Sequence, residues 1–301
     1  MKDETLQDYK SRILRVLLHI QRHLDHELDL VELAGIAAFS PFHFHRVFRG
    51  MVGESVKAHV RRLRLERAAV ELKRSARPVT TIALDSGYET HEAFTRAFRE
   101  AFGDSPSGFR TSRTAVPRAG APSDVHFRPE GEIADFRPHE SGGEAMKVEV
   151  ESVEPTRVAF MRHFGPYDKC GDTWERFLAW AGAEGLLGAK ARFIGLCHDD
   201  PEITPSEKIR YDACLTVDEG FKPVGEIGVQ TIEGGPYARA THFGPYDRLG
   251  ETYARLAGEW APRSGWRLRT APCFEVYLNS PESTEPEDLL TDVYLALEPK
   301  R

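Results

Sequence analysis

The six-residue segment 163–168, His-Phe-Gly-Pro-Tyr-Asp, occurs again without change at positions 242–247, an offset of 79 residues. After one inserted residue the correspondence continues at an offset of 80, where Asp212 matches Asp292. Two copies of about 75–80 residues are too few and too long for a solenoid of short repeats. The back part of the chain is therefore predicted to be a pseudo-symmetric α+β domain.

Each copy shows the pattern strand–helix–strand–strand, over about residues 146–217 and 226–298. Apolar and polar residues alternate as in a strand, most clearly at 147–153. The helix of each copy carries an apolar stripe with helical spacing. The two stripes match at an offset of 79, with Trp174, Phe177, Leu178 and Ala181 corresponding to Tyr253, Leu256, Ala257 and Trp260.

Residues 1–113 have apolar residues at three- and four-residue spacing, which predicts an all-α domain. Asp29 is a candidate N-cap, and Ser40 followed by Pro41 is another. A long helix is predicted over about 55–74, and Pro78 prevents its continuation.

This front part is also duplicated, at an offset of 50. The matched positions are Phe44, Arg46, Phe48, Arg49 and Gly53 against Phe94, Arg96, Phe98, Arg99 and Gly103. Each copy is a short helix, a tight turn and a second helix with an outward Arg, which is the plan of a helix-turn-helix unit. Residues 114–145 are rich in Pro, Gly, Ala and Ser and are predicted to be a linker, with a short strand at 125–128 or 132–136.

The net charge of −7 is divided unequally between the two parts. Residues 1–113 carry a net charge of +4 and the remainder carries −11. A mildly basic front part can meet phosphates although the whole chain is acidic. The chain has four cysteines without a CxxC pair and no apolar run of about 18 residues, so we expect a cytoplasmic protein without a disulfide framework or membrane span.

The predicted helix 55–74 is about 30 Å long at 1.5 Å per residue. Successive major grooves on one face of B-DNA lie about 34 Å apart. A stiff connector of this length can hold two recognition helices in adjacent major grooves, so one polypeptide can read a bipartite site on double-stranded DNA.

Two parts of the chain each resemble a known family. Residues 9–113 resemble the AraC/XylS-type DNA-binding domain, in the segments LVELAGIAAFSPFHFHRVFRGMVGESV and IALDSGYETHEAFTRAFREAFGDSPSGFR. Residues 146–301 resemble the GyrI-like effector-binding domain in HFGPYD, DDPEITPSEKIRYDACLTV and PCFEVYLN. The domain order is that of Rob-like regulators. One departure is Ala38, where the second unit has Gly87 in its turn.

The helices predicted to read DNA are 41–49 and the corresponding part of 90–102. Arg can bridge guanine O6 and N7, Glu can accept from a cytosine amino group, and Phe can contact a thymine methyl. The resemblance places Phe42, His45 and Arg46 at base-reading positions. The full candidate set is Phe42, His45, Arg46, Arg49, His91, Glu92, Thr95, Arg96 and Arg99. The alternative is that Phe42 belongs to the core and the arginines are solvated.

The effector site is predicted around Glu275, which aligns with Gly195 in the other copy. A carboxylate between apolar neighbours, facing a glycine that leaves space, is a candidate buried acid that seeks a cation or a proton. With aromatic walls it would bind a lipophilic cation. The predicted walls are Tyr277, Phe164, Tyr167, Trp174 and Phe193. The alternative is that Glu275 pairs with an Arg and the aromatics are ordinary core.

The leading hypothesis is a transcription regulator that reads DNA, senses a small molecule and meets RNA polymerase. The alternatives are a GyrI-like small-molecule hydrolase, with Glu275 and a Tyr activating water, and a protein that sequesters drugs or toxins. No Ser-His-Asp, Cys-His or metal constellation predicts a wider set of catalytic residues, and no cofactor is expected. His19, His23 and His26 lie on one helical face, but no Cys or carboxylate reinforces a metal site there, so a solvated or phosphate-facing helix is favoured.

Overall fold

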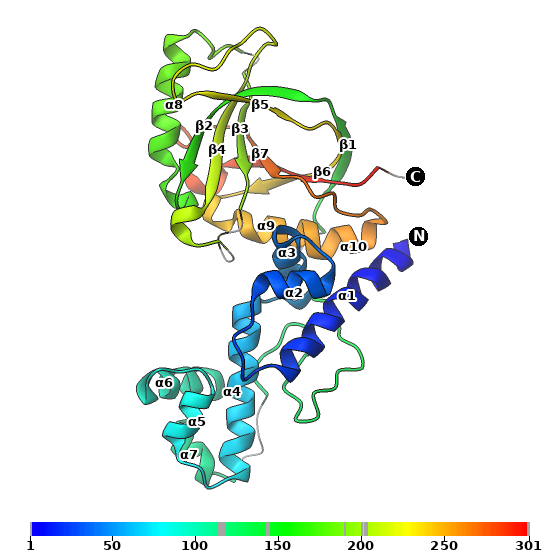
Figure 1. Cartoon of the computed structure of the whole chain (residues 1–301), viewed down its shortest axis with the longest axis vertical. Coiled ribbons are helices and arrows are strands. Elements are labelled where there is room, and N and C mark those ends of the chain that lie inside the picture. The colour runs from blue at the N-terminus through cyan, green and yellow to red at the C-terminus, as the bar shows by residue number, and fades with distance from the viewer. Residues whose placement is uncertain are drawn as a thin grey trace. The chain divides into compact units, whose positions relative to one another are not determined.

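The computed structural model describes residues 2–113, 118–142, 145–189, 191–199, 201 and 204–299. Residues 7–141 form one compact unit, and residues 142–301 form the other together with the first six residues of the chain (Figure 1). No helix in the described ranges has both the length and the apolar character needed to cross a membrane. The two units are described separately.

The first unit is helical, as predicted. Its helices are α1 (Lys2–Arg22), α2 (Leu30–Ala37), α3 (Pro41–Val52), α4 (Val56–Arg74), α5 (Val79–Asp85), α6 (His91–Phe102) and α7 (Pro106–Thr111). The predicted caps are confirmed, because Asp29 accepts from the backbone N–H of Val31 and Ser40 accepts from that of His43. These side chains satisfy backbone donors that the first turn of a helix leaves unpaired.

The duplicated helix-turn-helix plan is also confirmed. The turns after α2 and α5 close with the same backbone bond, from Phe39 N–H to the Ala34 carbonyl and from Tyr88 N–H to the Ala83 carbonyl. Ala38 and Gly87 occupy the same left-handed position in the two turns, at φ of 53° and 80°. The alanine therefore makes the same turn as the glycine, although a Cβ is unfavourable there.

Each helix-turn-helix unit packs around two phenylalanines of its second helix. These four side chains are fully buried: Phe44 and Phe48 in α3, and Phe94 and Phe98 in α6. The helix α4 connects the two helix-turn-helix units. It has 19 residues and is therefore about 28 Å long at 1.5 Å per residue. It ends before Pro78, as predicted. The length of this helix is therefore close to the length of about 30 Å predicted from the sequence.

Residues 118–141 contain no helix or strand, so the short strand expected at 125–128 or 132–136 does not form. Val125, Ile133 and Phe136 are nonetheless buried, and the segment belongs to the same compact unit as the helices. Residues 114–117 and 143–144 of the predicted linker lie outside the described residues.

The second unit is one eight-stranded antiparallel sheet with the strand order β1-β6-β8-β7-β3-β4-β2-β5. The strands are β1 (Glu149–Val153), β2 (Thr156–Phe164), β3 (Phe193–Cys197), β4 (Arg210–Thr216), β5 (Gly228–Ile232), β6 (Gly235–Phe243), β7 (Cys273–Tyr277) and β8 (Leu290–Ala296). Figure 1 shows the sheet strongly curled, with α8 (Gly171–Ala183) beside β2 and β4. Each copy is strand–helix–strand–strand, as predicted, plus one edge strand.

The edge strands are exchanged between the two copies. The strand β1 precedes the first copy along the chain but pairs with β6 of the second, with Glu149 opposite Arg239. The strand β5 precedes the second copy but pairs with β2 of the first, with Gln230 opposite Val158. The central β3–β7 pair joins the two copies into one sheet, and the outer edge of each copy is completed by the strand that precedes the other copy.

The inserted residue of the second copy is accommodated in its helix. This helix runs as α9 (Leu249–Ala254), continues as a π-helical turn over Arg255–Trp260, and ends as α10 (Ala261–Ser264). A π-turn takes up one extra residue. The match of Ala181 to Trp260 is therefore wrong: Ala261 is the fully buried equivalent of Ala181, and Trp260 is only half-buried.

Candidate DNA-reading helices and effector site

Helix α6 presents the side chains expected of a recognition helix. Phe94, Ala97 and Phe98 are buried on one face. The predicted DNA-reading residues lie elsewhere on the helix. Thr95 is half-buried, and the other four are exposed: His91, Glu92, Arg96 and Arg99. Thr90 caps the helix by accepting from the N–H of Ala93, so α6 begins directly after the turn, as a recognition helix does.

Helix α3 has the same spacing but a different surface. The guanidinium of Arg46 lies 4.0 Å from the centre of the Phe42 ring, a cation–π contact that ties the two side chains together. Phe42 and Arg49 are half-buried, whereas His45 and Arg46 are buried. The α3 side chains are thus less exposed than those of α6, and their contact with DNA stays a prediction.

In the sheet domain, β3 and β7 pair at the middle, so that Glu275 lies opposite Gly195. Glu275 is 5% exposed. Its carboxylate accepts a hydrogen bond from the Tyr277 hydroxyl at 2.7 Å and one from the Tyr253 hydroxyl at 3.1 Å, and the Cys197 Sγ lies 3.4 Å away. The predicted buried acid is thus held by two hydroxyls and a thiol.

A second layer of hydrogen bonds supports these donors. The hydroxyl oxygens of Tyr211 and Tyr277 are 2.7 Å apart, and the Trp174 indole N–H donates to Tyr211 at 3.0 Å. Burial first, and then the charge of Glu275, raises the pKa of Tyr211 and of Tyr277 well above the usual value. Both hydroxyls therefore keep their protons and can donate toward the carboxylate.

Glu275 takes part in none of the ion pairs of the described residues. The alternative that it pairs with an Arg is therefore not what the structure shows. A buried carboxylate surrounded by aromatic rings and lacking a cationic partner is an arrangement that favours a cation from outside.

The other predicted pocket residues fall into two groups. The rings of Trp174 and Tyr277 are 5.6 Å apart, and the Tyr167 ring lies 5.8 Å from that of Tyr211, so these residues surround the acid. Phe193 is half-buried and packs against the core under α8. Phe164 is 64% exposed and lies on the opposite face of β2 from its neighbour His163, so the structure does not bring it to Glu275.

Three tyrosines of this cluster were missed from the sequence. Tyr211 and Tyr253 hydrogen-bond within it, and the half-exposed ring of Tyr246 lies 5.4 Å from Tyr277. Tyr246 repeats Tyr167 in the second copy of HFGPYD, which suggested a role in the fold alone. Tyr211 lies on β4, Tyr253 on α9 and Tyr246 in the short turn before α9, so these tyrosines come from three separate segments.

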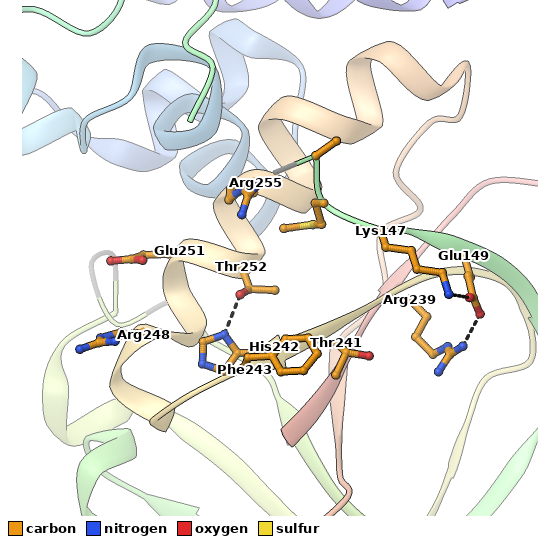
Figure 2. A pocket seen from close by; sticks show the side chains of 12 residues that line it. Lys147, Glu149, Arg239, Thr241, His242, Phe243, Arg248, Glu251, Thr252 and Arg255 are labelled. Atoms are coloured by element: carbon orange, nitrogen blue, oxygen red, sulfur yellow. Dashed lines mark hydrogen bonds and ion pairs between the residues drawn. The ribbon is translucent and has the colours of Figure 1, made fainter. Parts of the chain in front are cut away.

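A separate cavity of about 680 Å³ lies between the start of β1, β6 and α9 (Figure 2). It does not include Glu275. Several of its polar groups are already paired, since Lys147 lies 3.0 Å from Glu149 and Arg239 lies 3.0 Å from Asp292, and the Thr252 hydroxyl is bonded to His242 at 2.8 Å. This cavity is therefore distinct from the buried carboxylate of Glu275.

The histidine run of α1 shows an internal arrangement. The rings of His19 and His23 stack with centres 4.1 Å apart, and the His23 Nδ1 lies 2.8 Å from the His19 carbonyl oxygen. Within the described ranges, no three His, Cys, Asp or Glu side chains are grouped as a metal site requires.

Two helix-turn-helix units on a connector helix, followed by a duplicated sheet with a buried acid, define a protein that joins a DNA-reading domain to a small-molecule-binding domain. Comparison with known proteins agrees. The chain belongs to the family of the GyrI-like small molecule binding domain, whose model matches residues 146–298, and residues 33–112 match a helix-turn-helix domain. The resemblance of the front part of the chain to the AraC-type DNA-binding domain is thereby confirmed.

Individual relatives cover parts of the chain. The right origin-binding protein of Escherichia coli (strain K12) is 35% identical over 105 residues, which is 35% of this chain and 36% of that protein. The probable transcriptional regulator YgiV of the same strain is 35% identical over 125 residues, 40% of this chain and 78% of that protein. A solved EcmrR–DNA complex is 21% identical with a TM-score of 0.42, over 50% of this chain and 57% of that chain. The chain thus spans about a third of the length of the first of these relatives.

Proposed function

We propose that the protein is a cytoplasmic, DNA-binding transcriptional regulator of the AraC, Rob and SoxS type. The observation that carries the proposal is the pair of helix-turn-helix units joined by a 19-residue helix. That length, about 28 Å, approaches the separation of adjacent major grooves, which is about 34 Å. The exposed Arg96 and Arg99 of α6 supply the groups that bond to guanine edges and phosphates.

A gel-shift titration tests this proposal. Its DNA is a duplex selected from a random-sequence library for binding to the wild-type protein. Arg46→Ala is expected to weaken binding to this duplex by about 1–3 kcal/mol. Arg176→Ala is the matched control, because it removes one exposed arginine from the sheet domain. Unchanged affinity for Arg46→Ala would remove α3 from the DNA interface.

For the effector, the proposal is a small lipophilic cation bound against Glu275. Support comes from the burial of this carboxylate, from its lack of an ion pair, and from the rings of Trp174, Tyr246 and Tyr277 beside it. A cation gains there both from the carboxylate and from the aromatic faces. Tyr246 is 36% exposed and forms the outer edge of the cluster, so its ring is the one that must turn to admit a ligand.

Calorimetric titration with tetraphenylphosphonium tests this assignment. Glu275→Gln keeps the size of the side chain but removes its charge, and it is expected to weaken binding about tenfold or more. Glu226→Gln is the control, because Glu226 is an exposed acid that pairs with Arg176. Equal affinity in Glu275→Gln and wild type would reject Glu275 as the cation site. Turnover of an electrophilic small molecule that is abolished by Glu275→Gln would instead support the hydrolase alternative.

A further inference from the structure

Residues 118–141, predicted as a linker, are bound to the first helix-turn-helix unit along most of their length. We infer that this segment, called the arm below, is a brace that fixes α3 against α4 and thereby positions the first DNA-reading helix. The role of the arm in DNA binding rests on the function proposed above. The contacts that form the brace all lie inside the compact unit of residues 7–141.

The first anchor of the arm is on α1. The side chain of Gln21, only 6% exposed, donates to the carbonyl of His126 at 2.8 Å and accepts from the N–H of Arg128 at 3.3 Å. One amide side chain thus satisfies two backbone groups of the arm, as a neighbouring strand would. At the far end of the arm, Lys10 lies 2.9 Å from Asp135.

The second anchor is on the connector helix. Glu66 of α4 is 4% exposed, and a buried carboxylate requires donors. The arm supplies two of them, the His126 Nδ1 at 2.9 Å and the Phe127 N–H at 2.7 Å. The third is Arg62 of α4, whose Nη1 lies at 3.1 Å. Two of these three groups therefore come from the arm.

Arg62 extends this anchor to the corner between α3 and α4. Its Nη2 donates to Glu54 at 2.6 Å, and Glu54 is also bonded to the fully buried His59 at 2.8 Å. Glu54 is the middle residue of the three-residue gap, 53–55, between α3 and α4. The arm is thus linked through Glu66 and Arg62 to the residue that sets this corner.

The third anchor is on α3 itself. The N–H of His139 donates to the carbonyl of Met51 at 2.7 Å, in the last turn of α3, where carbonyls lack helical partners. Gly53 ends this helix at φ +80°. A Cβ on Gly53 would collide with Pro122 and would lie 2.7 Å from the His139 ring, so the arm occupies the space beside this glycine.

The residues that the structure describes include no such brace for the second helix-turn-helix unit. Its equivalent of Gly53 is Gly103, at φ +78°, and a Cβ there would meet no atom within 4 Å. Its buried core cluster contains residues of α4 to α7 and none from 118–141. The two copies therefore differ in the arm, which acts only on the first recognition helix.

This difference supplies a matched pair of variants in the full-length protein. Gly53→Ala and Gly103→Ala both place a Cβ in the left-handed region, but only Gly53→Ala also displaces the arm. Chymotrypsin cleaves after Phe127 and Phe136, which lie in the arm. We expect cleavage there to be about tenfold faster in Gly53→Ala than in Gly103→Ala or the wild type. Equal cleavage in the two variants, or rapid cleavage of the wild type, would overturn the brace.

A second pair covers the case in which Gly53→Ala does not fold. Glu66→Gln keeps the size of the side chain but replaces one acceptor oxygen with an NH₂ group, so the donors that converge on Glu66 can no longer all be satisfied. Glu71→Gln is its control on the same helix, because Glu71 pairs with Arg77 and not with the arm. Faster cleavage after Phe127 is expected only in Glu66→Gln, and equal rates in both variants would contradict the brace.

The positioning role has its own readout. The selected duplex is lengthened by one to three base pairs between its two half-sites. We expect the wild type to lose affinity about tenfold and Glu66→Gln to lose less, because its first recognition helix is no longer fixed. If Glu66→Gln shows faster cleavage of the arm but the same dependence of affinity on spacing as the wild type, the brace does not position α3. If the wild type binds no DNA at all, the regulator proposal fails, and the cleavage experiment still decides the brace.

Discussion

Gly195 lies directly opposite Glu275 across the β3–β7 pair, and a Cβ on this glycine would collide with the hydroxyl oxygens of Tyr211 and Tyr277. The glycine thus provides the space in which two tyrosines point toward one carboxylate. It also explains why the two copies differ at this position: one supplies the acid and the other leaves room for the groups that hold it.

The first prediction concerns this glycine. Gly195→Ala is expected to displace the tyrosine pair, remove the Tyr277 bond to Glu275, and lower the affinity for tetraphenylphosphonium about tenfold. The sheet should persist, because alanine is tolerated in a strand. Calorimetric titration together with circular dichroism measures both properties. A folded Gly195→Ala protein with wild-type affinity would show that the tyrosine pair does not prepare the site.

The second prediction compares two residues of α6. Arg96→Ala is expected to weaken binding to the selected duplex by about 1–3 kcal/mol. Glu92 is an anion on the same exposed surface, so Glu92→Ala is expected to strengthen binding to random-sequence DNA. Gel-shift titrations at two salt concentrations measure both effects. Weaker binding to random DNA after loss of Glu92 would contradict its placement near phosphates.

The third prediction uses the two turns. Ala38 is held in the left-handed region, where a Cβ costs roughly 1–2 kcal/mol, while glycine loses more backbone entropy on folding. Ala38→Gly is therefore expected to stabilise the helical domain by about 0.5–1 kcal/mol. Gly87→Ala is the converse, since its Cβ would lie 2.7 Å from an Arg64 guanidinium nitrogen and should destabilise the domain. Thermal unfolding of both variants tests the pair, and destabilisation by Ala38→Gly would refute it.

The fourth prediction is a pH dependence at Asp212, which is fully buried. Burial alone would raise its pKa, but hydrogen bonds from Arg162, His198 and Gln230 together lower the pKa from 3.8 to about 2. Because the folded pKa is below the unfolded one, the carboxylate stabilises the fold above pH 3.8. That contribution, roughly 2 kcal/mol, is lost as the pH falls from 3.8 through 2.

Asp212→Asn removes this titration. The variant is expected to unfold more easily at pH 7 and to lose less stability between pH 4 and pH 2 than the wild type does. Thermal unfolding of the sheet domain across this range provides the measurement. An acid-induced loss of the same size in both proteins would show that another carboxylate is responsible.

The sequence by itself determined the elements and their duplication. Repeated segments such as HFGPYD, the capping residues Ser40 and Thr90, and the helical spacing of Phe44 and Phe48 are local signals, and local hydrogen bonds and periodicity fix what they encode. The alignment of Glu275 with Gly195 also follows from the repeat, but the pairing of these two residues does not: Cys197 aligns with Tyr277 and yet pairs with Cys273.

Tertiary structure alone decided how distant segments meet. The exchange of β1 and β5 between the copies, the gathering of Tyr211 and Tyr253 around Glu275, and the absence of Phe164 from that cluster depend on long-range pairing, which no local pattern records. The segment 118–141 has the composition of a linker, yet buried Glu66 and Gln21 bind its backbone. Composition measures the tendency of a segment to form its own structure; its partners elsewhere in the chain determine whether it is bound.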